Sequence, residues 1–406
     1  MAQRFILNGT SYHGAGAIQE IATEVKSRGF KKAFVCSDPD LVKFGVTAKV
    51  LKVLDDNGFS YELYSNIKPN PTIENVQTGV EAFKNAGTDY LIAIGGGSSM
   101  DTAKAIGIII NNPEFADVRS LEGVADTKNP AVPIIAVPTT AGTAAEVTIN
   151  YVITDAEKNR KMVCVDPHDI PVVAVVDPDM MSSMPKGLTA ATGMDALTHA
   201  IEAYVSTLHC PYTDPLALQA IEMVLAYLPA SYNKNMEARE QMHYAQCLAG
   251  MAFSNALLGI VHSMAHKTGA AFEGGHIIHG AANAMYLPKV IKFNAKDETA
   301  AKRYAFIADF LHLGGNTQDE KIDNLIAMLR KMNDELNIPH CIKNYGEGGL
   351  PAETGFVSEE EFKAKLHDIA ANAILDACTG SNPRQPSQEE MEKLLTCCYY
   401  DTEVDF

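Results

Sequence analysis

The apolar residues in the first half of the chain follow two alternating patterns. Residues 32–36, 90–94 and 132–137 form short, almost continuous apolar runs, which are typical of strands buried on both faces. Residues 42–54 and 73–85 carry apolar side chains at helical spacing instead. This alternation predicts an α/β fold in which helices cover both faces of a parallel sheet.

The second half of the chain has a different pattern. After an apolar run at 172–177 the strand patterns fade, and from residue 187 onward helical patterns dominate. The clearest of them span 216–228, 241–258, 300–313 and 321–336. We therefore place a domain boundary near residue 184, with an α/β domain over 1–184 and a helical domain over 185–406.

A glycine-rich turn follows the apolar run at 90–94. Residues 95–99 read Gly-Gly-Gly-Ser-Ser, and a helix is expected from about Met100. The glycines permit a tight turn and a close approach of the backbone, and the amides at the helix start attract an anion. The spacing matches neither the G-x-G-x-x-G nor the Walker motif, so a structural turn is the alternative to a phosphate-binding loop.

A second polar turn, at 138–143, also follows a predicted strand. Ligands of parallel sheets bind outside the carboxyl ends of the strands, so two such loops favour a bound dinucleotide. Asp38 ends the strand at 32–36 and is suited to the hydroxyls of an adenosine ribose, where it would repel a 2′-phosphate. A surface turn residue is the alternative for Asp38.

Histidines gather between residues 192 and 280, which hold seven of the chain's twelve. Asp195 and His199 are four residues apart, as are His262 and His266, so each pair shares one face of a helix. A carboxylate with several imidazoles is a ligand set for a divalent transition metal. Core histidines without a ligand are the alternative, but two such pairs favour a metal.

Composition and charge narrow the possible partners. The 406-residue chain has a formal net charge of −17 and no cluster of Lys or Arg, which argues against nucleic acid or an anionic membrane. No apolar stretch is long enough to span a membrane, and the first residues do not resemble a signal peptide. We expect a cytoplasmic protein whose eight cysteines, none of them in a C-x-x-C motif, are buried free thiols.

Four motifs together identify a family. They are the glycine turn at 95–98, the turn at 138–143 with its continuation to Thr148, the run 193–202, and the run 262–266. With these motifs the chain resembles the iron-dependent (group III) alcohol dehydrogenases over essentially its whole length, including Asn382-Pro383-Arg384. Residues 111–123 and 164–171 are most similar to the lactaldehyde reductases (propanediol oxidoreductases) within that family.

The resemblance implies a dehydroquinate synthase-like architecture. An N-terminal domain binds the dinucleotide, an all-α C-terminal domain binds the metal, and the metal lies in the cleft between them. It also implies a homodimer or a larger homo-oligomer. The metal ligands that it implies are Asp195, His199, His262 and one of His276 and His279. The cofactor contacts that it implies are Asp38, Asn70, Gly96, Gly97, Ser98, Thr139, Thr140, Thr143 and Lys161.

Three further roles follow from the same resemblance, and one departure from the family pattern bears on the fourth ligand. His266 would serve proton transfer near the nicotinamide, and Asn150 and Phe253 would line the substrate pocket.

His276 has the family's spacing from His262, but His279 is followed by the family's glycine and Ala-Asn-Ala continuation. Because loops accept insertions while a packed helix keeps its register, we expect His279 to be the ligand.

The activity that the resemblance implies is NAD(H)-dependent interconversion of a small aldehyde and a primary alcohol. Lactaldehyde and 1,2-propanediol are the favoured pair, and a general dehydrogenase for ethanol, butanol or 1,3-propanediol is the alternative. The metal, Fe²⁺ in preference to Zn²⁺, would act as a Lewis acid on the substrate oxygen.

Two alternatives lie outside this reaction class. A metal-dependent lyase resembling dehydroquinate synthase would need several basic groups for its anionic substrate, and residues 192–280 contain only Lys234, Arg239 and Lys267. A metal-binding protein without activity is the other alternative.

Overall fold

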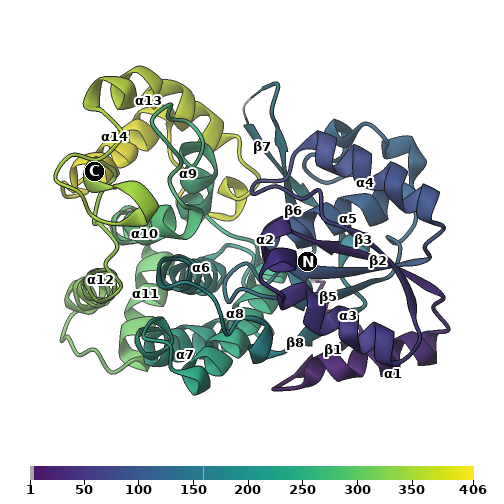
Figure 1. The fold of residues 1–406 in the computed structure, drawn as a ribbon. Coiled ribbons are helices and arrows are strands. Elements are labelled where there is room, and N and C mark those ends of the chain that lie inside the picture. Colours follow the sequence, from purple (N-terminus) through teal and green to yellow (C-terminus); the bar gives the residue numbers. More distant parts are fainter. Residues whose placement is uncertain (1–3, 159) are drawn as a thin grey trace. The chain divides into compact units, whose positions relative to one another are not determined.

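The chain folds into two compact units. The computed structural model describes residues 4–158 and 160–406, so part of the N-terminal segment considered for a signal peptide lies outside the described residues. One unit spans Phe5–Met184, and the other spans Pro185–Phe406 and includes Arg4. Figure 1 colours the chain along its length, with the first unit in purple to blue and the second in teal to yellow.

A six-stranded sheet forms the centre of the first unit. Its strand order is β1-β8-β5-β4-β2-β3, and every neighbouring pair is parallel, which confirms the predicted parallel sheet. The order changes direction between β2 and β4, so the loops after these two strands meet at the switch point where such sheets bind ligands. The strands are β1 (Thr10–His13), β2 (Lys32–Ser37), β3 (Ser60–Tyr64), β4 (Tyr90–Gly95), β5 (Ile134–Pro138) and β8 (Val173–Val176).

Helices cover both faces of this sheet, because its central strands are apolar on both sides. On one face, α4 and α5 pack against side chains such as Phe34 and Leu91. On the other face, α1 and α3 pack against side chains such as Val35 and Ile92 (Figure 1). The helices of this unit are α1 (Glu20–Arg28), α2 (Pro39–Lys43), α3 (Val46–Asp56), α4 (Ile73–Ala86) and α5 (Gly97–Asn111).

Two features of the first unit differ from the patterns read from the sequence. The helical pattern at 42–54 is interrupted by Gly45, whose φ of 76° ends α2 and lets α3 begin. The antiparallel hairpin β6 (Asn150–Asp155) and β7 (Arg160–Val165) was not predicted. Its two strands pair mainly with each other and form a separate sheet, and each is only partly apolar.

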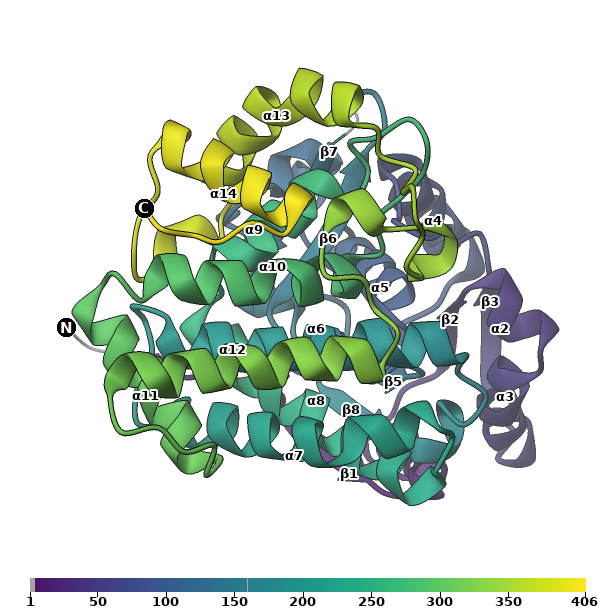
Figure 2. The same ribbon diagram turned by 90° about the vertical axis from the view of Figure 1, so that its left-hand side faces the viewer.

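The second unit is helical, which confirms the all-α half of the predicted fold. Its most buried helices are α6 and α10, which pack against each other. Figure 2 looks onto this unit, with α12 in front, α10 above it and α7 below. The helices are α6 (Lys186–Val205), α7 (Asp214–Tyr232), α8 (Met236–Ala256), α9 (Ile260–Thr268), α10 (His279–Asn294), α11 (Glu298–Phe310), α12 (Gln318–Glu335), α13 (Glu359–Ile374) and α14 (Gln388–Tyr400).

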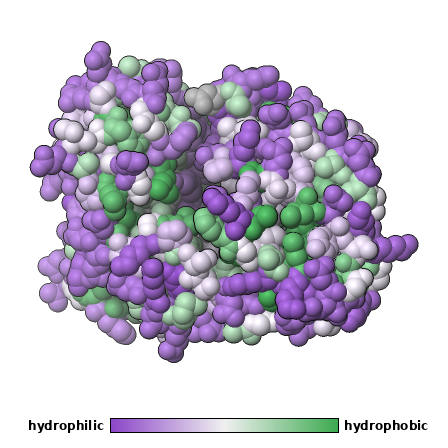
Figure 3. All heavy atoms as spheres, viewed as in Figure 1, coloured by the Kyte–Doolittle hydropathy of each residue, from purple (hydrophilic) through white to green (hydrophobic). Residues whose placement is uncertain are grey.

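The surface of the protein and the state of its cysteines agree with what the composition predicted. Hydrophilic residues cover most of the face in Figure 3, and apolar residues occur there in small groups. In the described part of the chain no single helix combines the length and apolar character of a membrane span; α8 and α9 reach that level only together, across a bend of 102°. All eight cysteines are buried free thiols, as expected.

Candidate metal centre and nucleotide loops

Helix α6 carries the first polar groups of the metal centre on one face. Asp195, His199 and Glu202 lie at positions i, i+4 and i+7, so their side chains project from the same side of the helix. All three are buried in a helix that is mostly apolar. Buried polar groups of this kind require partners, and these come from helices far along the chain.

Helices α9 and α10 supply the partners. His262 lies in the first turn of α9 and is 1% exposed, and His279 is the first residue of α10. Gly280 sets the position of His279, because a Cβ on Gly280 would lie 1.9 Å from the carbonyl oxygen of Ala191 on α6. A glycine is therefore required for α10 to approach α6 this closely.

The imidazole nitrogens of three histidines converge on one carboxylate oxygen. Nε2 of His262 and Nε2 of His279 each lie 3.5 Å from Oδ1 of Asp195, and Nε2 of His199 lies 3.8 Å from it. The donor atoms of Asp195, His262 and His279 all lie within 4.8 Å of one another. The structure thus brings together four of the residues that the family resemblance implied as ligands.

An amide group stands among these donor atoms. Nδ2 of Asn283 donates to Oδ1 of Asp195 at 2.8 Å and lies 3.2 Å from Nε2 of His262 and 3.4 Å from Nε2 of His279. Asn283 is one helical turn after His279 on α10. Nδ2 of Asn283 therefore lies where the lone pairs of the Asp195 carboxylate and of the two imidazoles point toward one another.

The electrostatics of the cluster favour positive charge. Burial alone would raise the pKa of Asp195, but His199, His279 and His262 outweigh burial and hold the pKa well below its usual range. Burial alone would lower the pKa of His262, but hydrogen bonds with Asp195 and Glu202 raise it to about 9. A buried site that stabilises a proton among its own donors is also suited to a cation.

Glu202 contacts the opposite edge of the His262 ring. Nδ1 of His262 lies 2.6 Å from Oε2 of Glu202, so Nε2 is the nitrogen directed toward Asp195. The same carboxylate accepts hydrogen bonds from the backbone amides of Gly259 and Val261 at the start of α9.

Aromatic stacking orders the rings further. Phe253 on α8 stacks on His199 with ring centroids 4.2 Å apart, and His199 stacks on His262 at 4.5 Å. Phe253 is 4% exposed, and its contact with His199 supports the orientation of that ring.

His276 lies apart from the converging donors. Its Nδ1 contacts the carbonyl oxygen of Gly269 at 3.3 Å, and the side chain is exposed on the loop before α10. The loop is held by Lys365, which donates to the carbonyl oxygen of Ala271. The residues between α9 and α10 thus form a loop, and His279 begins the helix that packs against α6.

His266 belongs to a neighbouring polar group. Its ring is parallel to that of His279, with centroids 5.2 Å apart, and its Nδ1 lies 3.2 Å from Oδ2 of Asp376. Lys267 is 2.8 Å from the same oxygen. His266, Asp376 and Cys378 could also hold a metal by their spacing, but the Lys267 ammonium already compensates the carboxylate. The first cluster is therefore the better cation site.

The first unit brings its two predicted loops together. The helix α5 starts at Gly97, and the backbone at Gly95 has a φ of 150°. A Cβ on Gly96 would lie 3.2 Å from the side chain of Thr140, and one on Gly97 would lie 3.2 Å from that of Thr143. The glycines thus let the threonine loop lie directly against the glycine loop.

Asp38, Thr139, Ser98 and Asn70 lie around the same edge of the sheet. Asp38 caps α2, accepting hydrogen bonds from the amides of Asp40 and Leu41 with Oδ1 alone. The amide of Thr139 donates to the carbonyl oxygen of Gly95. Ser98 occupies the first turn of α5, and Asn70, with a φ of 55°, lies in the turn between β3 and α4.

The hairpin β6–β7 carries Asn150 and Lys161. Two side chains of α5 hold this hairpin by its backbone: Asp101 accepts from the amide of Val152, and Lys104 donates to the carbonyl oxygens of Thr148 and Asn150. Lys104 is buried and pairs with the buried Asp169 at 3.3 Å. Helix α5 thus connects the glycine loop and the hairpin physically.

The residues present fit a divalent metal of the kind that the sequence predicted. One carboxylate and three imidazoles meet here, and all but the partly exposed His279 are buried. The hydrogen bond of His262 with Glu202 leaves its Nε2 pointing into the cluster. This donor set suits iron or zinc rather than Mg²⁺ or Ca²⁺, which prefer oxygen ligands.

Comparison with known proteins identifies the family. Residues 8–178 match the model of the iron-containing alcohol dehydrogenases, and residues 189–399 match that of the C-terminal part of the Fe-containing alcohol dehydrogenase family. This chain belongs to the iron-containing alcohol dehydrogenase family. The family indicated by the sequence motifs is thus confirmed, and the chain is an oxidoreductase of small alcohols and aldehydes.

Three relatives illustrate the range of this family. The chain is 49% identical over 405 residues to the NADPH-dependent butanol dehydrogenase of Clostridium saccharobutylicum, covering 99% of this chain and 100% of that protein. It is 48% identical over 396 residues to the lactaldehyde reductase of Escherichia coli, covering 97% and 99%. A crystal structure of a 1,3-propanediol oxidoreductase is similar with a TM-score of 0.89 and 34% identity, covering 98% and 100%.

The sequence patterns did not point to several residues of this candidate site. Glu202 was noted only as part of a motif, although its position three residues after His199 places it on the ligand face of α6. Asn283 is four residues after His279, a spacing that could have drawn attention to it. Asp376 lies 110 residues from His266, and no local pattern points to it.

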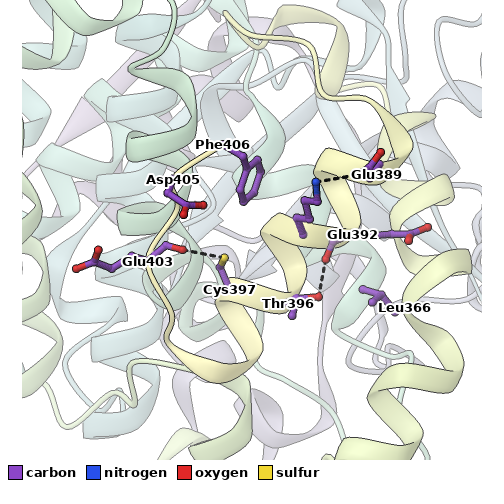
Figure 4. Close-up of a pocket in the computed structure, with 9 residues that line it drawn as sticks. Leu366, Glu389, Glu392, Thr396, Cys397, Glu403, Asp405 and Phe406 are labelled. Carbon is purple, nitrogen blue, oxygen red and sulfur yellow. Dashed lines mark hydrogen bonds and ion pairs between the residues drawn. The ribbon is translucent and has the colours of Figure 1, made fainter.

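A separate pocket of about 450 Å³ lies beside α14 and the C-terminal tail (Figure 4). None of the candidate site residues described above lines it. Its lining residues are Leu366, Glu389, Glu392, Lys393, Thr396, Cys397, Glu403, Asp405 and Phe406. Lys393 is paired with Glu389, and Cys397 donates to the carbonyl oxygen of Glu403. Lys393 and Cys397 thus have partners within the pocket lining itself.

Proposed function

We propose that the chain binds Fe²⁺ through Asp195, His199, His262 and His279 and interconverts lactaldehyde and 1,2-propanediol with NAD(H). The observation that carries the metal assignment is the convergence of three Nε2 atoms on one oxygen of Asp195. When bound, the metal supplies a Lewis acid for the substrate oxygen.

The dinucleotide part of the proposal is supported by the loops after β4 and β5, which lie against each other at the carboxyl end of the sheet. Gly96 and Gly97 have no side chain that could keep a pyrophosphate from the backbone, and the amides at the start of α5 favour its negative charge. Thr140 and Thr143 offer hydroxyls beside these glycines. Thr139, Ser98 and Lys161 are further candidate contacts, as is Asn70.

The choice of NAD(H) over NADP(H) is supported by Asp38. Asp38 directly follows β2, and one oxygen of its carboxylate is held by two backbone amides of α2, which restricts its rotation. In this position it would accept hydrogen bonds from ribose hydroxyls and repel a 2′-phosphate.

The role proposed for His266 is proton transfer. Asp376 accepts the Nδ1 hydrogen of His266, which leaves Nε2 as the atom that can accept or donate a proton. Lys267 shares the Asp376 carboxylate and keeps it ionised, since these two neighbours hold the pKa of Asp376 well below its usual range despite burial. Asn150 remains a candidate for contact with substrate, and Phe253 a candidate that acts through His199.

A second candidate is an NADPH-dependent dehydrogenase of butanol or another short alcohol, which the relative from C. saccharobutylicum favours. Protein loaded anaerobically with Fe²⁺ should oxidise NADH with lactaldehyde at a higher kcat/KM than NADPH with butanal. The reverse order would support the second candidate. Metal bound stoichiometrically without NADH or NADPH oxidation by any short aldehyde would overturn both.

The proposal also includes a cytoplasmic homodimer or larger homo-oligomer acting on a small-molecule substrate, without nucleic acid or membrane as a partner. Its support is the family resemblance and the acidic net charge of −17. Analytical ultracentrifugation of the metal-loaded protein tests the oligomeric state, and a monomer at micromolar concentration would contradict it.

A further inference from the structure

The carboxylate of Glu202 is a buried acceptor with three donors. Glu202 is 3% exposed, and it accepts from the amide of Gly259 at 3.1 Å, from the amide of Val261 at 2.8 Å and from Nδ1 of His262 at 2.6 Å. Buried charges are tolerated only when such hydrogen bonds replace water. All three donors belong to the start of one helix, α9, so Glu202 links α6 to the segment that presents His262.

The geometry determines which nitrogen of His262 is available. A carboxylate has no hydrogen to donate, so the short contact with Glu202 places the hydrogen on Nδ1. In the neutral ring Nε2 then carries the lone pair, and Nε2 is the atom that faces Asp195. An acceptor on the outer edge of a histidine is the arrangement that orients metal-binding imidazoles.

The start of α9 is built so that this contact cannot shift independently. A Cβ on Gly259 would lie 2.8 Å from Oε1 of Glu202 and 2.7 Å from Oδ1 of Asn382, so only glycine fits there. Asn382 accepts from the amide of Ile260 and exchanges hydrogen bonds with Asn294. Glu202 and Asn382 therefore hold the same helix start from two sides. Among the described residues, the hydrogen bond to the His262 ring comes from Glu202 and not from Asn382.

We propose that Glu202 is a positioning residue of the metal site, which holds His262 in the tautomer and orientation that direct Nε2 to the ion. The proposal rests on the proposed function, since it takes His262 to be a metal ligand. It predicts that Glu202 controls metal affinity through the ring, beyond its contribution to the helix start.

The variant E202Q tests this with little change in volume. A glutamine has one acceptor oxygen and one amide donor in place of two acceptors. It cannot accept from both the Val261 amide and the His262 ring with separate oxygens, and an amide donor facing Nδ1 would favour the hydrogen on Nε2. We expect E202Q to bind metal about 10- to 100-fold more weakly than the parent.

The matched control is N382A, which removes a hydrogen bond from the same helix start and leaves the His262 contact intact. Full-length parent, E202Q and N382A, each free of metal, are titrated with Co²⁺ against a chelator of known affinity. Thermal unfolding of the metal-free proteins measures how far each variant weakens the fold. We expect E202Q to lose affinity and to change the visible absorption bands of Co²⁺, while N382A keeps the parent's bands and stays within a few-fold of its affinity.

Parental affinity and absorption in E202Q would overturn the proposal. Losses in both variants that follow their thermal destabilisation would also overturn it, because Glu202 would then be only structural. If the parent itself fails to bind Co²⁺, the metal assignment of the proposed function fails first. If E202Q does not fold, ¹⁵N-histidine spectra of the parent loaded with Zn²⁺ provide the test: a hydrogen on Nδ1 of His262, assigned with H262N, supports the proposal, and one on Nε2 overturns it.

Discussion

Gly280 illustrates how a single residue selects between two histidines. His276 precedes α10 and His279 begins it, and of these two histidines only His279 has its Nε2 near Asp195. The carbonyl of Ala191 leaves no room for a Cβ at position 280, so the first turn of α10 must lie where it does. The residue before this glycine is then directed into the cluster, whatever the length of the preceding loop.

We predict that H279A loses bound metal and H276A retains it. Removing one of four ligands opens the site to water and lowers affinity, whereas the hydrogen bond found for His276 among the described residues is with the backbone of Gly269. Elemental analysis after anaerobic reconstitution with Fe²⁺ is the measurement, with the parent beside both variants. Metal loss in H276A together with retention in H279A would reverse the assignment.

Asp38 combines two roles that a substitution can separate. Its Oδ1 caps α2, and its charge is the feature proposed to exclude a 2′-phosphate. Glycine at this position would remove both, whereas asparagine keeps a capping oxygen and removes only the charge. The informative substitution is therefore D38N.

We predict that D38N raises kcat/KM for NADPH relative to NADH. A like-charge contact with a 2′-phosphate costs on the order of several kcal/mol, and most of that cost disappears with the charge. The control is D40N, which neutralises the neighbouring carboxylate of α2 that does not cap the helix. An unchanged NADPH to NADH ratio in D38N, or an equal change in D40N, would make Asp38 only a cap.

At the scale of elements, α5 organises the nucleotide half of the molecule. Its N-terminus carries the glycine loop, and its half-buried Asp101 and buried Lys104 bind the backbone of the β6 segment. Asp169 lies beside Lys104 and is fully buried. Burial raises the pKa of Asp169 to about 8 and that of Asp101 to about 7, with Lys104 offsetting part of the effect.

These raised pKa values make the contribution of the two carboxyls to stability depend on pH. Above about pH 4 the unfolded state releases protons that the folded state keeps. The contribution of these two carboxyls to the free energy of unfolding is therefore highest below that pH and is lost as the pH rises to about 8. Each proton released on unfolding lowers stability by about 1.4 kcal/mol per pH unit.

We predict that D169N reduces the loss of stability between about pH 5 and pH 8, because its amide cannot ionise. Urea unfolding across this range measures the slope for the parent, D169N and the control D126N, in which an exposed carboxylate is neutralised. Parallel slopes for the parent and D169N would show that Asp169 is ionised in the folded protein throughout.

At the scale of the whole molecule, the chain consists of two compact units with separate chemistry. The proposed metal ligands all come from the unit that contains α6, α9 and α10, and the glycine loop belongs to the unit of the parallel sheet. Metal binding to the folded state stabilises the elements that supply the side-chain ligands. The free energy of this stabilisation grows with the logarithm of the metal concentration divided by Kd.

We predict that metal removal affects the two units unequally. Chelation should increase amide hydrogen exchange in peptides from α6, α9 and α10, and should leave the strands of the parallel sheet close to their original protection. Exchange measured by mass spectrometry on metal-loaded and metal-free protein tests this, with reloading as the control. An equal loss of protection in the sheet would contradict it.

The sequence by itself determined those features that depend on near neighbours. Apolar runs and helical spacing predicted the parallel sheet and the helical second half, because side-chain periodicity is a property of the local backbone. The glycine turn, the polar turn at 138–143 and the pairs Asp195/His199 and His262/His266 were visible for the same reason. The hairpin β6–β7 escaped notice, since each strand is only partly apolar and its pairing is mostly with the other.

Tertiary structure alone decided which distant groups meet. Glu202 reaches His262 across 60 residues of sequence, and Asp376 reaches His266 across 110, and no period or spacing encodes either contact. The position of His279 depends on how closely α10 approaches α6 at Ala191, which is a matter of packing between helices. Local patterns specify the elements, but the geometry of a metal centre arises only when packed helices bring their polar faces to one point.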